Sequence, residues 1–232
     1  MNRHPKRPAR GVSRSNADRK RTDIMNQAAR LFDNVGYHRT TMEDIAEAVG
    51  IRKPTLYHYF SGKADILFVI HEEIIDLLIE RQLARGKTSL SAQQQLLGII
   101  EDILDFMQTQ RGHLRAFFEH YRELPKKYQE TIRRKRRRYF DLVHSVVTSG
   151  MESGAFRPLN SRVTTLAIFG MCNWVYQWYD PGGALGARDI AYVFWDLASR
   201  GVDNERVRPP ISGATSVRRL SGEDSLIEGG EA

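Results

Sequence analysis

Side chains that could carry out chemistry are sparse in this chain, and their spacing fits no catalytic site. The pair His71-Glu72 lacks the second histidine of a zinc-protease helix. The segment 61–63, Ser-Gly-Lys, lacks the upstream glycine of a phosphate-binding loop. The glycines at 182–186 follow a helical pattern rather than a strand, so they are no dinucleotide fingerprint. We therefore expect no enzyme and no cofactor.

Cysteine and histidine usage favours neither a metal site nor a secreted protein. Cys172 is the only cysteine and lies in an apolar stretch, which indicates an inert core thiol in a reducing compartment. His113 and His120 have no cysteines or suitable acids beside them. The most apolar run, 166–179, is too short and too polar to span a bilayer. We expect a soluble, cytoplasmic protein with no bound metal and no membrane partner.

The segment 36–67 is the most informative part of the chain. Thr41 can cap a short helix, with Asp44 three residues on, and Gly50 makes a turn. Pro54 then opens a second short helix, where its missing N–H costs nothing. Leu56 points back into a small core, together with Phe60, while Thr55, Tyr57 and His58 can face outward. Hydroxyl, aromatic and basic side chains on one outer face are typical of a DNA-reading helix.

Positive charge is concentrated before this segment. Residues 1–21 hold eight Lys or Arg and one acid, Asp18, so this arm accounts for the net charge of +7. The arm is too polar to fold alone, but neutralising phosphates would release counterions from a polyanion. A solubilising tail is the alternative interpretation; beside a DNA-reading helix, DNA contact is favoured.

Helical periodicity extends through nearly all of the chain, and no run alternates as a strand would. We predict an all-α protein with four segments: a disordered basic arm (1–17), a helix-turn-helix domain (18–64), a helical ligand-binding and dimerisation domain (65–202) and a disordered tail (203–232). The first helix is expected to begin near Asp18, and a short helix to run from His113 to Leu124.

The residues of segment 36–67 also resemble a known family. The pattern Gly36-Tyr37, Thr40-Thr41-Met42, Ile45-Ala46, Val49-Gly50-Ile51, Pro54, Leu56-Tyr57, Tyr59-Phe60, Lys63 and Leu67 resembles the DNA-binding domain of TetR-family regulators. Members often have Gly where this chain has Pro54, and Ser where it has Gly62. The resemblance implies a three-helix head with a helix-turn-helix, and a larger helical body that binds a ligand and dimerises through its last two long helices.

The resemblance also implies what the head does. Each head of a two-fold dimer would enter the major groove of one half-site of a near-palindromic double-stranded operator. Repression is the expected mode, although the family includes activators. Thr55 and His58 are expected near base edges, and Leu56 and Tyr59 to pack. The expected DNA-binding residues are Arg10, Arg14, Thr40, Thr41, Arg52, Lys53, Thr55, Tyr57, His58 and Lys63.

The stretch 162–179 is apolar nearly all round, which implies burial on two sides. One face would pack inside the subunit and the other against a second copy in a homodimer, with Tyr192 and Trp195 covering the seam. Closed two-fold dimers are the commonest soluble oligomers. Purely intramolecular packing of these aromatic residues is the alternative.

Aromatic residues of the body predict a ligand pocket or, equally, a plain core. The expected lining is Phe106, Met107, Phe117, Phe118, Tyr121, Trp174, Gln177 and Trp178. The segment 173–183 resembles that of family members that sense fatty-acyl or steroid-derived CoA thioesters, which suggests a role in lipid metabolism. The effector would then be a small hydrophobic molecule or an acyl-CoA.

The basic run Arg133–Arg138 spreads over every face of a helix. A solvated face is its default interpretation, and binding the phosphates of a CoA ester is the alternative. For the whole chain, the alternative function is a DNA-binding regulator without a small-molecule effector, whose body serves only for assembly.

Overall fold

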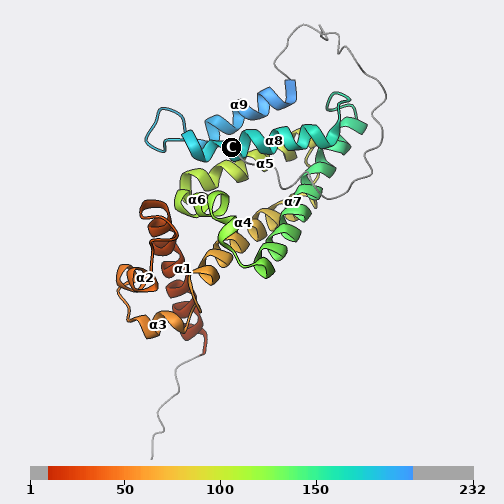
Figure 1. The fold of residues 1–232 in the computed structure, drawn as a ribbon. Coiled ribbons are helices and arrows are strands. Elements are labelled where there is room, and N and C mark those ends of the chain that lie inside the picture. The colour runs from red at the N-terminus through yellow and green to blue at the C-terminus, as the bar shows by residue number, and fades with distance from the viewer. Residues whose placement is uncertain (1–9, 201–232) are drawn as a thin grey trace, which may run out of the picture. The chain divides into compact units, whose positions relative to one another are not determined.

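The computed structural model describes residues 10–200, and all regular structure within them is helical (Figure 1). Residues up to Ser199 form one compact unit. The predicted tail, 203–232, and the first nine residues of the basic arm lie outside the described residues. The elements are α1 Arg10–Asn34, α2 Met42–Val49, α3 Lys53–Tyr57, α4 Lys63–Arg85, α5 Ala92–Thr109, α6 Arg111–Glu119, a 3-10 turn η1 Tyr121–Glu123, α7 Lys126–Glu152, α8 Ser161–Trp178 and α9 Ala187–Arg200.

Two predicted helix boundaries are wrong. Helix α1 begins at Arg10 rather than near Asp18, because no proline lies between Pro8 and the end of the helix at Asn34 to break the backbone ladder. Helix α6 ends at Glu119 and is followed by η1, whereas the sequence predicted one helix as far as Leu124. Leu124 is extended (φ −71°, ψ 140°), as the residue before a proline tends to be.

Local capping defines the helices of the head. The Thr41 hydroxyl accepts the backbone N–H of Asp44 at 3.1 Å, and the Asp44 carboxylate accepts that of Thr41 at 2.8 Å. This reciprocal pair is the capping box that the sequence predicted at the start of α2. Gly50 ends the same helix at φ 69°, in the left-handed region that glycine tolerates best.

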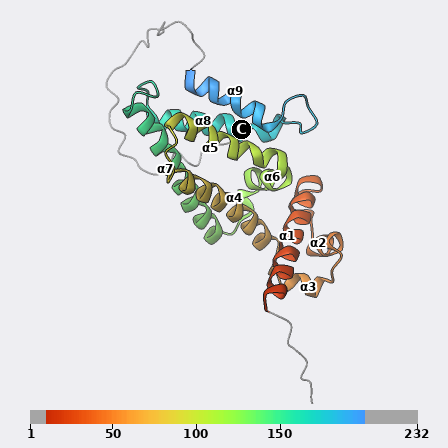
Figure 2. The same cartoon turned by 180° about the vertical axis from the view of Figure 1, so that it is seen from behind.

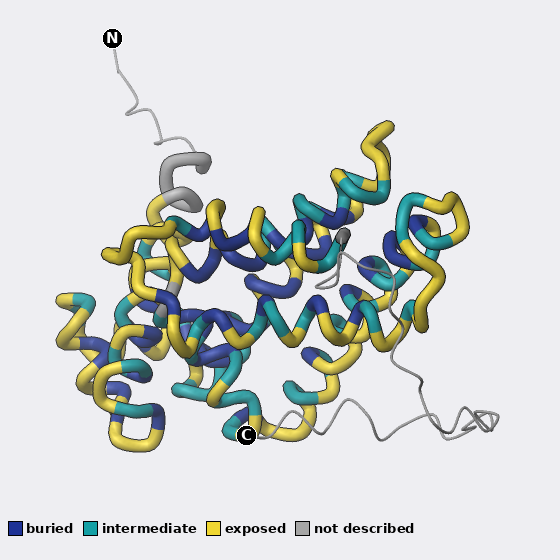
Figure 3. The backbone as a smooth tube through the Cα atoms, turned by 90° about the horizontal axis from the view of Figure 1, so that it is seen from above, coloured by how far each residue is buried: buried dark blue, intermediate teal, exposed yellow. Residues whose placement is uncertain are grey.

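A small apolar core holds α1, α2 and α3 together. Ile24, Phe32, Ile45 and Leu56 are at most 1% exposed and come from all three helices. The core continues along α4, which packs against α1 at its start and against α5, α6 and α7 further on (Figure 2). In Figure 3 the buried residues lie along the inward sides of these helices. The head is thus fixed to the first turns of α4.

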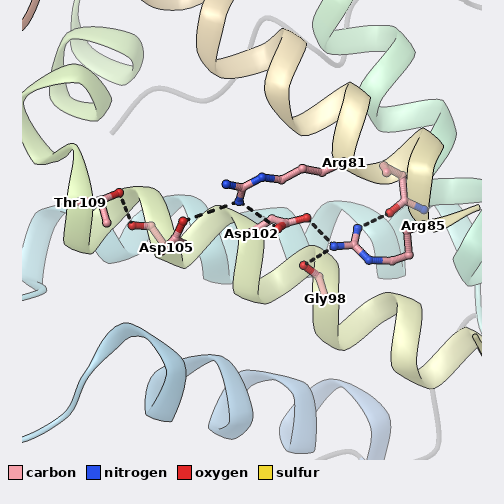
Figure 4. A network of polar contacts seen from close by, with 7 residues as sticks. Arg81, Arg85, Gly98, Asp102, Asp105 and Thr109 are labelled. Atoms are coloured by element: carbon pink, nitrogen blue, oxygen red, sulfur yellow. Dashed lines mark hydrogen bonds and ion pairs between the residues drawn. The ribbon is translucent and has the colours of Figure 1, made fainter.

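An ion-pair network fastens the far half of α4 to α5 (Figure 4). Asp102 lies between two arginines of α4, with Arg81 at 3.0 Å and Arg85 at 2.5 Å. Arg85 also donates to the carbonyl oxygen of Gly98 at 3.1 Å. A Cβ at position 98 would lie 2.6 Å from the Arg85 Nε, so the missing side chain leaves room for the guanidinium. Three ion pairs and one backbone hydrogen bond thus join α4 to α5.

Candidate nucleic-acid interface and effector site

Helix α3 presents the outward face that its sequence predicts. Thr55, Tyr57 and His58 are exposed, Tyr57 at 47%, while Leu56 is fully buried and Tyr59 is half-buried. Packing of Leu56 against α1 and α2 fixes which side of this short helix faces outward. A hydroxyl, a phenol and an imidazole are therefore available together for hydrogen bonds to a ligand.

Two basic residues precede this face. Arg52 and Lys53 are exposed at the start of α3, where a helix N-terminus favours anions. Lys53 forms an ion pair with Glu43 of α2, and this hydrogen bond raises the lysine pKa. Because both side chains are largely exposed, an approaching phosphate could replace Glu43 at little cost.

The structure gives Thr40 and Lys63 roles inside the fold. Thr40 is 1% exposed, and its hydroxyl donates to the carbonyl oxygen of Gly36 at 2.9 Å. The Lys63 ammonium donates to the carbonyl oxygens of Tyr37 at 2.7 Å and His38 at 3.3 Å. Both side chains therefore stabilise the α1–α2 turn, which argues against the direct DNA contacts expected of them.

The other expected DNA-binding residues lie at two helix starts. Thr41 is exposed at the start of α2, with its hydroxyl engaged in the cap. Arg10 and Arg14 lie in the first turns of α1, and their side chains are outside the described part of the structure. Sequence reasoning missed Arg21, whose guanidinium lies over the Phe60 ring at 4.5 Å and bonds the Tyr59 carbonyl at 3.4 Å. That side chain ties α1 to the end of the α3 segment.

Polar contacts join the head to α6 and η1, and the start of α4 to α7. His38 Nε2 lies 2.9 Å from a carboxylate oxygen of Glu123 in η1. Arg115 of α6 forms a second contact, an ion pair with Asp33 of α1 at 2.7 Å. The Tyr128 hydroxyl of α7 donates to Asp65 in the first turn of α4. Movement of α6 or η1 would therefore reach the head directly.

The structure separates the predicted pocket residues into two groups. Phe106, Met107 and Phe117 are buried in the body, and Phe118 stacks on Tyr176 with ring centroids 4.9 Å apart. Tyr121 is half-buried beside this group. Trp174, Gln177 and Trp178 are instead exposed on the outer side of α8, the tryptophans at 53% and 51%. The periodicity of α8 gives two apolar faces but does not say which one lies inside.

Helices α8 and α9 carry much of the exposed apolar surface of the described residues. Trp195 was predicted to cover the dimer seam together with Tyr192. Its indole N–H instead donates to the Gln93 carbonyl oxygen of α5 at 3.0 Å, inside the subunit. Tyr192 is 44% exposed and does belong to the exposed apolar surface. We call this surface the outer apolar face; its members are Val163, Leu166, Trp174, Trp178, Tyr192, Val193 and Leu197.

The side chains of the basic run of α7 point in three directions. Arg133, Arg134, Arg137 and Arg138 are exposed, and the last three line an open groove of about 470 Å³. Lys135 bridges to Glu72 at 2.6 Å and Asp76 at 2.7 Å on α4. The Arg136 guanidinium turns inward onto the rings of Phe117 and Tyr121. The signal for this was present, since Arg136 follows Ile132 by four residues and precedes Tyr139 by three on the buried stripe.

Two family models match this chain. One, described as bacterial regulatory proteins of the tetR family, matches residues 24–70, from the middle of α1 to the first turns of α4. The other, described as a tetracyclin repressor-like C-terminal domain, matches residues 89–202. The chain belongs to the TetR family of transcriptional regulators. TetR-family proteins bind operator DNA, usually as dimers, and are not enzymes.

Individual TetR-family relatives agree with this assignment. The chain is 31% identical over 117 residues to the transcriptional activator FasR of Mycolicibacterium smegmatis, a match that spans 49% of this chain and 53% of FasR. It is 24% identical to the transcriptional repressor KstR2 of the same organism, over 85% of this chain and 95% of KstR2. Among solved structures, PfmR of Thermus thermophilus has a TM-score of 0.73 at 25% identity, covering 78% of this chain and 98% of PfmR.

KstR2 of Mycobacterium tuberculosis has the same TM-score at 22% identity, covering 80% of this chain and 96% of that one, which shows a shared fold. The expected fold class, a helix-turn-helix head on a helical body, is confirmed. Within the described residues, no helix combines the length and apolar character needed to cross a membrane.

Proposed function

We propose that this chain is a dimeric TetR-family repressor that binds a near-palindromic operator and is released by a small, mainly apolar effector. The observation that carries the proposal is the outward face of α3, where Thr55, Tyr57 and His58 are exposed while Leu56 anchors the helix. An anchored helix with free polar side chains can read base edges in the major groove. Repression is favoured by the KstR2 relatives, which match along most of this chain and are named as repressors.

The outer apolar face supports a homodimer. Its residues gather on α8 and α9, the two helices that follow α7, and expose large side chains that water solvates poorly. A second copy is the occupant that the family suggests, because its members usually act as dimers. A two-fold axis would place two α3 helices on half-sites about 34–36 Å apart.

The proposed effector is an amphipathic lipid-derived molecule, with an acyl-CoA as the leading candidate. One structural neighbour, AibR, was solved with isovaleryl coenzyme A and operator DNA, and it has a TM-score of 0.69 at 24% identity. Another relative is named a fatty acid metabolism regulator, of Bacillus subtilis. The exposed arginines along the α7 groove offer forked donors for the phosphates of such a ligand.

Control of DNA binding would pass through the contacts between the head and η1. An effector that moves α6 or η1 changes the position of Glu123 beside His38, and hence the angle of the head. Because operator half-sites have a fixed spacing, a small change in angle weakens binding by both heads. The effector can release DNA only in proportion to its preference for the altered conformation.

The alternative, a regulator without an effector, is favoured by one observation. A second hollow, between α5, α7, α8 and α9, has a volume of only about 20 Å³, too small for an acyl chain. A regulator of this kind would bind DNA constitutively, and its body would serve assembly alone.

DNA recognition is tested by selecting operator sequences from a random DNA library with the full-length protein. We expect a near-palindromic consensus, and fluorescence anisotropy should then show that Tyr57→Ala weakens binding at least tenfold. The matched control is Leu90→Ala, a change of another exposed side chain on the loop after α4. Recovery of no consensus, or full affinity in Tyr57→Ala, would contradict the assignment of α3 as the reading helix.

A further inference from the structure

An arginine of the body, largely but not fully buried, has no acidic partner. The central guanidinium carbon of Arg136 lies 4.3 Å from the ring centroid of Phe117 and 4.6 Å from that of Tyr121. One terminal nitrogen donates to the Phe117 carbonyl oxygen at 3.1 Å. The Nε atom is sealed from solvent and has no hydrogen-bond partner. No aspartate or glutamate of the described residues forms an ion pair with this side chain.

A buried histidine lies against the same aromatic ring. His71 of α4 is fully buried, and its ring centroid is 4.9 Å from that of Phe117. Neither ring nitrogen makes a hydrogen bond of normal geometry, although the Ala116 backbone lies close enough to one of them to act on its pKa. Burial, Arg136 and His120, in that order, hold the pKa of His71 well below its usual value, and the Ala116 carbonyl acts weakly in the other direction. The ring is therefore neutral near pH 7 and offers one N–H donor.

The side chains of Arg136 and His71 are together better suited to bind an anion than to pack in an apolar core. Burial lowers the pKa of Arg136 to about 10, which leaves the guanidinium charged at neutral pH. An unpaired buried charge is unfavourable, and the two aromatic faces offset only part of that cost. The Nε–H of Arg136 and the imidazole of His71 each lie beside the ring of Phe117. Two donors suit a planar carboxylate, whereas a phosphate needs more of them.

We propose that Arg136 and His71 bind the carboxylate of an amphipathic carboxylic acid. The acid's apolar chain would lie along the contacting rings of Phe117, Phe118 and Tyr176, which lead from this site to α8. This assignment rests on the proposed function, because it names one class of effector for the same body. It differs from the acyl-CoA candidate in that the free acid, not the thioester, carries the recognised group.

The position of Tyr121 connects this site to the head. Tyr121 covers Arg136 and begins η1, the three-residue turn that ends with Glu123. Glu123 contacts His38 at 2.9 Å, and the ring of His120 lies 5.6 Å from that of Tyr37. A carboxylate that draws Arg136 away from Tyr121 would therefore shift a turn that touches the head at two places.

Thermal unfolding of the full-length protein with three probes of equal chain length tests the site: decanoate, decanol and decanoyl-CoA. We expect decanoate to raise the Tm of the wild-type protein by several degrees, and decanol to have little effect. Arg136→Met and His71→Phe should abolish the decanoate shift. Arg133→Met, which changes an exposed arginine of α7 outside the groove, should retain it.

The unliganded variants show whether Arg136 is instead structural. Because Arg136→Met removes a largely buried charge that has no acidic partner, its Tm without ligand should equal or exceed that of the wild-type protein. Arg136→Lys, which keeps the charge, provides a second folded variant with a weakened decanoate shift. No decanoate shift in the wild-type protein, or an equal shift in Arg136→Met, would overturn the carboxylate site. Stabilisation by decanoyl-CoA alone would overturn it while leaving the proposed effector function intact.

Discussion

The ammonium group of Lys63 is bonded to the carbonyl oxygen of Tyr37 at 2.7 Å, across 26 positions of the chain. It also lies 4.7 Å from the centre of the Tyr37 ring. The first residue of α4 is thereby fixed to the turn between α1 and α2. This single side chain links the helix that runs through the body to the part of the head that positions α2 and α3.

Lys63→Met should therefore destabilise the fold rather than act on DNA contact alone. A hydrogen bond from a charged group contributes about 1.5–3 kcal/mol, and partial exposure reduces this to about 1 kcal/mol here. We expect Tm to fall by roughly 2–4 °C. The control, Lys53→Met, removes an exposed ammonium and should leave Tm unchanged. An unchanged Tm in Lys63→Met, with a flatter salt dependence of DNA binding, would restore the DNA contact that the sequence predicted.

Much of the head could be predicted from the sequence because its determinants are local. The capping box joins Thr41 to Asp44 three residues away, and Gly50 supplies the left-handed turn itself. The spacing of Leu56 and Phe60 placed Thr55, Tyr57 and His58 on the outward side, as the structure has them. Such features depend on neighbours within one or two helical turns, so they do not require knowledge of tertiary packing.

The errors concern long-range packing. Helix α8 is apolar on two sides, and no local pattern shows that Trp174 and Trp178 lie on the outside. The bonds of Lys63 depend on how α4 approaches the α1–α2 turn, which the sequence does not encode locally. Arg136 is different, because its place on the buried stripe of α7 could have been recognised within the basic run.

The cap of α2 provides a second prediction. Thr41→Ala removes the hydroxyl that accepts the Asp44 N–H at 3.1 Å, and loss of such a cap costs about 1 kcal/mol. Urea denaturation should show this decrease in the free energy of unfolding. Thr41→Ser keeps the hydroxyl and should recover most of it. If Thr41→Ala is as stable as the wild-type protein but binds DNA less well, the hydroxyl acts on a phosphate instead.

The α4–α5 network gives a prediction with a built-in control. Asp102→Asn removes the charge that faces both Arg81 and Arg85, and breaking a largely buried ion pair costs on the order of 3 kcal/mol. Asp105→Asn makes the same chemical change at a carboxylate that is 53% exposed and 3.6 Å from Arg81. We expect it to change stability by less than about 0.5 kcal/mol. Equal effects of the two variants in chemical denaturation would contradict the assigned role of Asp102.

The outer apolar face predicts the assembly state. Light scattering after size exclusion should give twice the 26.6 kDa mass of one chain for the wild-type protein. Leu166→Glu places a charge in the middle of the face and should yield monomer, because a buried unpaired carboxylate opposes association. Leu83→Glu, at a residue of similar exposure on α4, should stay dimeric. A dimer in both variants would place the interface elsewhere.

Stability should fall as the pH decreases from 7 to 5, and His113 should account for part of the change. Burial lowers the pKa of His113 from 6.5 to about 4, and its Nε2 has no hydrogen-bond partner. Between these two pH values the unfolded chain binds a proton that the folded protein does not. The free energy of unfolding therefore decreases as the pH falls. At pH 5 the lowered pKa of His113 makes the free energy of unfolding smaller by about 2 kcal/mol than it would be with a histidine of normal pKa.

The measurement is the free energy of unfolding in urea at pH 7.5 and at pH 5.0, a range above the normal titration of carboxylates. His113→Leu should reduce the loss of stability between these two pH values by about 2 kcal/mol. His71 and His120, whose pKa values burial also lowers, would account for what is left. His58→Leu is the control, since its side chain is exposed on α3. The same pH dependence in wild-type protein and His113→Leu would show that position 113 is protonated in the folded state and hence open to water.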